Sequence, residues 1–220
     1  SAQCYWNGGQ LWYKKREAGW DDMTWMHRDW VNWCWLSGDH IIEQHVHNLD
    51  IMNWVIGTHP IKVVSFGSRQ RRVTGDQFDN FSSDFIYPGE GPVKEIHVHS
   101  MCRQISGCKD MVAERVIGQT GVSDCGGWVS TLPKVEFQNN DAYVQEHKDL
   151  IDAIRSGKSL NEVQNVAEST MTAIMARTSA YTGQEVTWDE MMKSDMQLSP
   201  PDYELTKENC LAHVAVPGKA

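Results

Sequence analysis

The sequence predicts an α+β fold, an open and mostly antiparallel β-sheet with helices packed on one face. A short strand pattern and a strong helical pattern occupy residues 1–57, strand patterns joined by turns fill 61–132, and two helical patterns follow at 141–181. Strands joined by turns pair in antiparallel fashion, whereas parallel neighbours need a long crossover connection. The helical patterns at either end of the strands are then available to cover one face.

The composition excludes several classes of partner. The 220 residues carry a net charge of −9, with 40% hydrophobic and 22% charged residues, which is ordinary for a globular domain. A negative chain without a basic stripe repels a phosphate backbone, so no nucleic-acid partner is expected. No window approaches the roughly 18 consecutive apolar residues of a membrane-spanning helix, so no membrane partner is expected either. The six cysteines have no C-x-x-C pair and predict free thiols.

The first third of the chain combines a strand, an aromatic excursion and a helix. Residues 4–7 end a strand at a pair of glycines, and residues 10–39 mix tryptophan, charge and glycine without a period, so short helical pieces are expected there. Eight of the ten tryptophans lie within the first 54 residues. Such a cluster can serve the core, a subunit interface or flat platforms for sugar rings.

Asp39 and Gly57 mark the ends of the strongest helical pattern, as N-cap and as the residue just past the end. Its apolar positions cover a broad face, so this helix is expected to be largely buried. After Pro60 the pattern changes to strands, which are predicted at 61–69, 78–87, 93–101, 113–118, 128–132 and 134–138. The turn at 88–91 joins the second and third of them as a hairpin.

The last third returns to helix. Two helices are predicted at 141–156 and 161–181, each closed by a glycine, with a short helical turn at 188–192. Residues 1–199 are expected to form one domain, and residues 200–220 a tail on the surface or on a partner subunit. Because the second face of an open sheet needs a cover, we predict a homo-oligomer formed through that face.

A set of polar residues on the first helix is the main candidate site. His40, Glu43, His47, Asp50 and Trp54 are spaced three, four, three and four residues apart, which places them on one stripe of a continuous helix. Burial of such charges without partners costs a few kcal/mol each, so the stripe is expected to line a wet cleft.

Three interpretations of this stripe stay open from spacing alone. It is a solvated polar face, or an acid/base site in which His47 exchanges a proton near neutral pH, or a metal site. The metal site would use His40, Glu43 and His47, but the spacing is not the H-E-x-x-H of zinc proteases and no metal ligand set is assigned.

Other candidates for substrate contacts lie elsewhere in the sequence. His97 and His99 flank one residue of a predicted strand and point to the same side of it, with Arg103 following. Arg28 and Trp33 lie close together in the aromatic excursion. Ordinary surface, interface or ion-pair roles are the alternative for all of them. The sequence has no G-x-G-x-x-G turn, so no residue is assigned to a dinucleotide.

The stretch SGDHIIEQHVHNLDIMNW at residues 37–54 resembles the third motif of the Gfo/Idh/MocA family, the relatives of glucose–fructose oxidoreductase and inositol dehydrogenase. In that motif a glycine-rich entry leads to an acid, then a histidine, then an aspartate, and these positions match Glu43, His47 and Asp50. Residues 141–154 and 180–190 resemble the family's closing helices, so the resemblance covers about residues 3–199.

The resemblance implies a two-domain enzyme. An N-terminal Rossmann domain binds NAD or NADP, and a C-terminal α/β domain carries the substrate site and the oligomer contacts. This chain is similar to the second domain, in the longer version common in bacterial proteins. By the resemblance His47 is the acid/base and Glu43 contacts or orients the substrate. Glu43 stands where the best-studied members have aspartate, and the family's E-K-P lysine has no match in this chain.

The resemblance therefore implies the substrate-binding domain of an NAD(P)-dependent oxidoreductase acting on a sugar, polyol or related carbohydrate, inactive without its cofactor domain. Two alternatives remain. One is a glycosidase or lyase that works through transient NAD-dependent oxidation, with or without a metal ion. The other is a non-catalytic carbohydrate-binding or assembly module. The compartment stays open between cytoplasm and periplasm.

Overall fold

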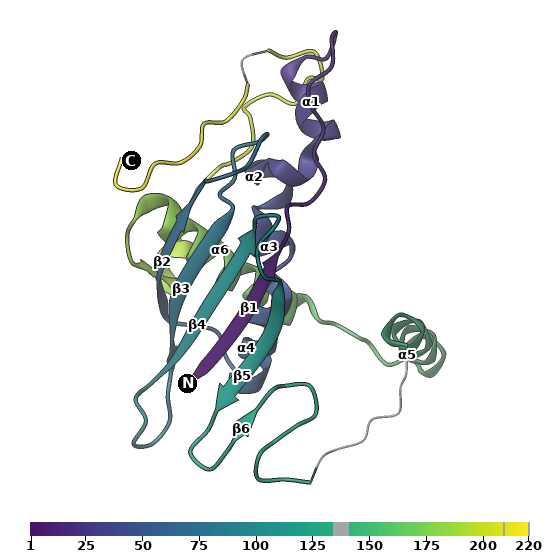
Figure 1. Ribbon diagram of the computed structural model, residues 1–220. Coiled ribbons are helices and arrows are strands. Elements are labelled where there is room, and N and C mark those ends of the chain that lie inside the picture. Colours follow the sequence, from purple (N-terminus) through teal and green to yellow (C-terminus); the bar gives the residue numbers. More distant parts are fainter. Residues whose placement is uncertain (134–140, 209, 220) are drawn as a thin grey trace.

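A computed structural model describes residues 1–133, 141–208 and 210–219, and it has one twisted sheet with helices on one face (Figure 1). The strands are β1 (Ala2–Gly8), β2 (Lys62–Ser68), β3 (Asn80–Pro88), β4 (Glu95–Gln104), β5 (Met111–Ile117), β6 (Val122–Ser123) and β7 (Val186–Thr187). Their order across the sheet is β6-β5-β1-β4-β3-β2-β7. The predicted α+β class and the open sheet are confirmed.

The first strand lies in the interior of this sheet, as the third of its seven strands. β1 pairs in parallel with β4 and antiparallel with β5, so that Cys4 has Ser100 on one side and Glu114 on the other. The remaining ladders are antiparallel. Hydrophobic pattern alone does not say which strands become neighbours, so this single parallel pairing was not predicted.

The helices are α1 (Asp22–Arg28), α2 (Cys34–Ser37), α3 (His40–Glu43), α4 (Val46–Ile56), α5 (Ala142–Ser156), α6 (Val163–Thr182) and α7 (Trp188–Met192), with a 3₁₀ turn η1 (Trp30–Asn32). α1, η1 and α2 are the short helical pieces expected in the aromatic excursion. Within the described ranges, none of the helices has the length and apolar character needed to cross a bilayer.

The helix predicted from Asp39 to Gly57 is wrong in one respect, because it is two helices. Its ends are as predicted: the Asp39 side chain caps the start, and Gly57 ends α4 in a left-handed conformation. Between α3 and α4, the backbone amides of Gln44 and His45 both donate to the carbonyl oxygen of His40, each at 3.1 Å. The chain therefore turns at this junction, and the His45 side chain enters the core.

The main core fills the space between the inner face of the sheet and helices α4 and α6. Leu49 and Met52 of α4 pack there against buried side chains of the strands. α6 presents Ala173, Ala176 and Ala180 to the same core, and these small side chains let its backbone approach the sheet closely.

A second, smaller core holds the aromatic excursion together. Met23, Met26 and Trp33 are its buried members, and Trp25, Trp35, Leu36, Cys210 and Leu211 pack around them. The chain after residue 200 thus returns to its own excursion, where the Cys210 amide donates to Asp22. Trp33 is therefore a core residue in this fold.

Several smaller expectations have mixed outcomes. All six cysteines are free, as predicted. The pattern at 128–132 forms only an isolated bridge between Val129 and Ser123, and the short strands β6 and β7 were not predicted. The expected strand at 134–138 lies outside the described residues.

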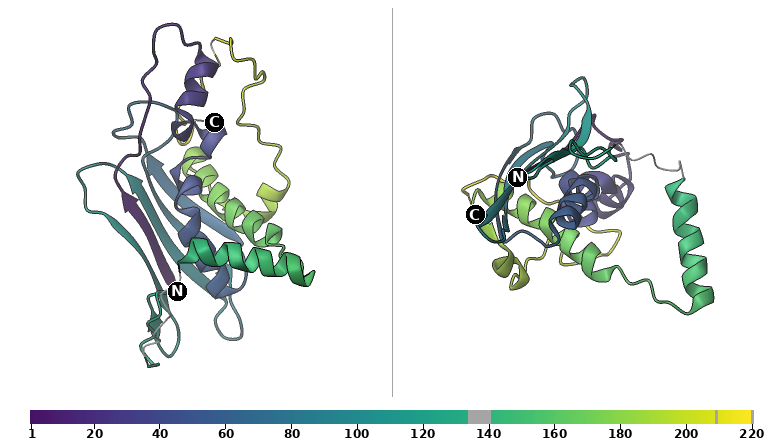
Figure 2. Two further views of the ribbon diagram at one scale, coloured as in Figure 1. Left: turned by 90° about the vertical axis from the view of Figure 1, so that its right-hand side faces the viewer. Right: turned by 90° about the horizontal axis from the view of Figure 1, so that it is seen from below.

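The sheet face opposite the helices is bare in the described chain. Outward-pointing apolar side chains there include Val64, Phe66, Met101, Met111 and Ile117. Helix α5 also stands free, at the end of a connection to α6, as Figure 1 and the right-hand view of Figure 2 show. None of its residues is buried.

Candidate functional site

The solvent side of α4 carries three members of the predicted stripe. His47, Asp50 and Trp54 are exposed, while Leu49 and Met52 on the other side of the helix pack into the core. Their spacing of three and four residues aligns them on one face. The structure therefore brings these three predicted residues together, in the first, second and third turns of α4.

His47 is exposed but supported from below. Its imidazole lies against the indole of Trp6 on β1, with ring centroids 5.8 Å apart and planes tilted by 36°. Trp6 shares the inner side of β1 with Cys4, which faces the core. The central strand of the sheet thus supports the ring of His47 while leaving it open to solvent.

Glu43 ends α3, before the turn that leads to this face, and lies half-buried. Its Oε2 atom is buried and has no hydrogen-bond partner among the described residues. A buried carboxylate oxygen without a donor is costly, and no described residue offsets that cost at Glu43.

Asp50 and Trp54 border a groove of about 710 Å³ between α4 and the start of α6. The Ser169 hydroxyl on α6 donates to Asp50 Oδ1 at 2.5 Å, which fixes the carboxylate at the groove wall. Trp54 is 79% exposed, so one face of its indole is free for stacking. The groove thus joins a hydrogen-bond acceptor and a flat apolar surface.

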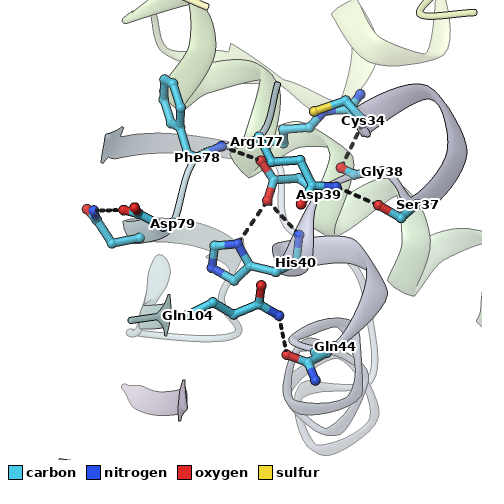
Figure 3. Close-up of polar contacts among 12 residues, drawn as sticks. Cys34, Ser37, Gly38, Asp39, His40, Gln44, Phe78, Asp79, Gln104 and Arg177 are labelled. Atoms are coloured by element: carbon cyan, nitrogen blue, oxygen red, sulfur yellow. Dashed lines mark hydrogen bonds and ion pairs between the residues drawn. The ribbon is translucent and has the colours of Figure 1, made fainter. Parts of the chain in front are cut away.

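His40 does not belong to the exposed face. It starts α3, is only 2% exposed, and its Nδ1 lies 2.8 Å from Asp39 Oδ1 (Figure 3). The turn between α3 and α4 separates it from His47. Among the residues that the structure describes, no group of three His, Cys, Asp or Glu side chains is arranged to hold a metal ion.

Asp39 anchors this junction in a conformation that is almost restricted to glycine, with φ 85° and ψ 159°. Its carboxylate is fully buried and accepts hydrogen bonds from the amide of His40 at 2.5 Å, the amide of Phe78 at 3.1 Å and the hydroxyl of Tyr181 at 2.5 Å. Burial alone would raise the pKa of this carboxyl, but the hydrogen bond from His40 and the charges of His40 and Arg72 hold the pKa below its usual range.

A chain of polar contacts continues from Asp39 to the helix junction. Arg72 donates to Gln104 Oε1 at 2.6 Å, and Gln104 in turn donates to Gln44 Oε1 at 2.6 Å. Arg177 on α6 donates to the carbonyl of Gly38 at 3.0 Å (Figure 3). This network fixes the residues on either side of Glu43. Sequence analysis named Asp39 only as a cap and missed Arg72 and Gln104, because their partners are distant in sequence.

His45 is excluded as the acid/base group by its burial. Its Nε2 lies 2.6 Å from Ser100 Oγ and its Nδ1 lies 3.0 Å from Asn48 Oδ1. Burial lowers the pKa of this imidazole to about 3, so it stays neutral at physiological pH. Of the three histidines at 40, 45 and 47, the one on the solvent face of α4 is His47.

The structure leaves four predicted substrate residues away from His47. Arg28 lies over the indole of Trp20 at 4.8 Å, and Trp33 is buried in the second core. His97 pairs with an aspartate across the sheet at 2.9 Å, and Arg103 donates to a backbone carbonyl at 2.6 Å.

Strand alternation explains the position of His97 and Arg103. Ser100 points inward to His45, so the odd-numbered residues of β4 point to the bare face. These two side chains and His47 are therefore separated by the sheet itself.

No family model matches the sequence, and no curated protein matches it. Solved structures do. GenD2 from gentamicin A biosynthesis, in complex with NAD, matches with a TM-score of 0.59 and 15% identity over 84% of this chain and 54% of that chain. Myo-inositol 2-dehydrogenase from Lactobacillus plantarum matches with a TM-score of 0.54 and 14% identity over 84% and 56%.

The WlbA dehydrogenase from Bordetella pertussis, in complex with NADH and UDP-GlcNAcA, matches with a TM-score of 0.58 and 14% identity over 84% and 54%. The chain thus spans about half the length of the solved structures it matches. At such identities the likeness is one of fold. The fold resemblance to Gfo/Idh/MocA-type oxidoreductases is confirmed.

Proposed function

We propose that this chain, which has a fold found in Gfo/Idh/MocA-type oxidoreductases, is the substrate-binding part of an NAD(P)-dependent oxidoreductase that acts on a sugar or polyol. The observation that carries the proposal is the position of His47. It is an exposed, sheet-supported imidazole on a helix face that otherwise presents acceptors and an indole. An imidazole exchanges protons near neutral pH, which suits a general acid/base.

The proposed role of His47 is to take the proton of a substrate hydroxyl as the carbinol carbon loses a hydride, leaving a carbonyl. In the reverse direction it returns that proton. The nicotinamide, when bound, supplies the hydride acceptor. Trp6 holds the imidazole in one orientation during the transfer, since its ring lies directly beneath that of His47.

Glu43, Asp50 and Trp54 suit a polyhydroxylated substrate. The carboxylate of Asp50 is an acceptor for hydroxyl donors, and the half-buried carboxylate of Glu43 is proposed as a second one. The exposed indole of Trp54 offers a surface for the apolar face of a sugar ring. This combination supports a carbohydrate or polyol as substrate.

The cofactor has to approach from outside the described chain. The sequence has no glycine-rich dinucleotide turn. The face that holds His47 is open to solvent, so another domain has room to lie against it. Two of the matched structures hold NAD or NADH, and nearly half of each lies outside the match. These findings support a separate dinucleotide-binding domain in the working enzyme.

The test uses the two-domain protein and follows cofactor reduction across a panel of sugars, polyols and glycosides. His47→Asn is expected to lower the rate by about two to four orders of magnitude, which is typical for loss of a positioned acid/base. His97→Asn is the matched control, because His97 is an exposed histidine on the other face of the sheet. Its rate is expected to stay within about twofold, the range of a surface change.

Three other results would each change the proposed function. Equal rates for His47→Asn and the parent would remove the acid/base assignment. Cleavage of glycosides without net cofactor reduction would support transient oxidation. Sugar binding that survives changes at both Glu43 and His47, without any turnover, would support a non-catalytic module.

A further inference from the structure

Helix α5 is completely formed but is covered by nothing in the described chain. The Asp141 side chain accepts hydrogen bonds from the amides of Tyr143 and Val144 at its start, and Gly157 ends it in a left-handed conformation. Yet none of its residues is buried. An isolated helix of about 15 residues is marginal in water, since most helical stability in proteins comes from packing.

The surface of α5 has two distinct sides. The apolar side consists of five exposed side chains, those of Tyr143, Val144, Leu150, Ile151 and Ile154. The opposite side carries Gln145, Asp149, Asp152 and Ser156. Ile154 alone is 71% exposed, which is far outside the usual environment of an isoleucine. A helix with such a stripe is built to lie against another surface.

The position of α5 narrows the choice of that surface. Figures 1 and 2 show α5 on the helix side of the sheet, standing apart from α4 and α6 and joined to α6 by residues 157–162. The exposed face of α4, with His47, Asp50 and Trp54, lies on this same side. A body that occupied the space next to α4 would therefore lie beside both α5 and the face that holds His47.

We propose that the apolar stripe of α5 docks on the dinucleotide-binding domain. This contact would position the domain over His47. The inference rests on the proposed function, which requires such a domain. The matched structures provide enough chain for it, because nearly half of each lies outside the match. A second copy of this chain is a poorer occupant, since the bare sheet face that suits self-association lies on the opposite side.

Hydrogen exchange tests this contact directly. Amide exchange over residues 142–156 is measured in the two-domain protein and in the 220-residue chain at two concentrations. We expect the α5 amides to exchange at least about tenfold more slowly in the two-domain protein, because packing suppresses local opening. Fast exchange in both proteins would overturn the inference. Protection of α5 in the 220-residue chain would also overturn the inference. Protection that rises with protein concentration would show that a second copy covers α5, and protection that does not change with concentration would show that the rest of the same chain covers it.

Paired variants of the two-domain protein separate packing from helix content. Leu150→Ala with Ile154→Ala removes two members of the stripe, whereas Gln145→Ala with Asp152→Ala changes the opposite side and keeps good helix formers in both cases. We expect the first pair to lose the protection of α5 and the second pair to retain it. Equal exchange for the two pairs would overturn the inference.

The cofactor-reduction assay keeps the two proposals apart. Turnover that depends on His47, together with an unprotected α5, would overturn only the docking of α5. A protected α5 in a protein whose turnover ignores His47 would overturn only the acid/base assignment.

Discussion

The indole of Trp6 and the imidazole of His47 lie 5.8 Å apart between centroids, with the central strand of the sheet beneath and solvent above. Trp6 belongs to β1 and His47 to the first turn of α4. This pair is the contact through which the sheet sets the orientation of the proposed acid/base group. Asp50 likewise depends on a contact from outside the stripe, the hydrogen bond from the Ser169 hydroxyl.

Replacement of Trp6 tests that contact. Trp6→Leu keeps an apolar side chain but removes the aromatic surface, and contacts of this kind are worth about 0.5–1.5 kcal/mol. We expect kcat of the two-domain protein to fall up to about tenfold with little change in KM, because orientation matters most in the transition state. Trp30→Leu, at an exposed tryptophan of the excursion, is the control. An unchanged kcat in Trp6→Leu would show that His47 needs no such support.

The backbone of Asp39 predicts an unusual order of stabilities. Asp39→Ala removes the buried acceptor for four donors, which are the amide and the ring of His40, the amide of Phe78 and the hydroxyl of Tyr181, at a cost of about 3–5 kcal/mol. Asp39→Gly loses the same contacts but relaxes a backbone conformation that costs side-chain-bearing residues about 1–3 kcal/mol. Urea unfolding should therefore find the glycine variant more stable than the alanine variant. The reverse order would contradict backbone strain at this position.

The burial of His45 predicts a loss of stability in mild acid. The pKa of its imidazole is about 3 in the fold, below the usual value, so the unfolded chain binds the proton more readily. The contribution of the neutral imidazole to the free energy of unfolding is complete above the unfolded pKa of about 6.5 and is lost as the pH falls from there towards 3. Between pH 7 and pH 4.5 the free energy of unfolding should decrease by about 2.5 kcal/mol from this group.

The measurement compares urea unfolding of the parent and of His45→Gln across that range. The glutamine cannot take up a proton, so the difference between the two pH profiles isolates the imidazole. Parallel profiles would contradict a neutral, buried His45.

Gly75 is required by its contact with the excursion. Its φ is 72°, and a Cβ atom there would lie 1.8 Å from the carbonyl oxygen of Asn32. Gly75→Ala is expected to destabilise the fold by about 2–4 kcal/mol through the clash and the left-handed backbone. Gly19→Ala is the control, since it has φ 85° and open space around it, and should cost about 1 kcal/mol. Similar losses at both sites, measured by urea unfolding, would contradict the close approach.

Self-association through the bare sheet face is the remaining prediction. Phe66 is 71% exposed on the outer side of β2, while the neighbouring Ser65 faces α6. Phe66→Asp should convert a homo-oligomer into a monomer in light scattering after gel filtration, because a buried charge opposes an apolar contact. Val163→Asp changes an exposed apolar residue on α6, away from that face, and should leave the oligomer intact. A parent that is monomeric at micromolar concentration would refute the interface.

The sequence predicted helix ends far better than helix continuity. Asp39 and Gly57 are local signals, because a cap acts on amides or carbonyls a few residues away. The turn at Gln44 and His45 depends instead on Ser100, which is 55 residues distant. For the same reason one predicted stripe divided into a buried His40 and an exposed His47.

Long-range choices account for the other differences. Alternation showed correctly that His97 and His99 share a side of their strand, but not which side faces the helices. Periodicity likewise predicted α5 and the glycine that ends it, but not that the rest of the described chain would leave it bare.

The central position of β1 has a consequence for how the chain assembles. Of the strands in this sheet β1 is made first, yet its two neighbours are the fourth and fifth of them, so this part of the sheet cannot close until more than one hundred residues have followed β1. Once β4 and β5 have formed, and before β1 pairs with them, each of the two has an unpaired edge. Pairings between distant segments slow folding, because loop closure precedes the contacts that reward it. We expect newly made chains to depend on chaperones until β1 has paired with both β4 and β5.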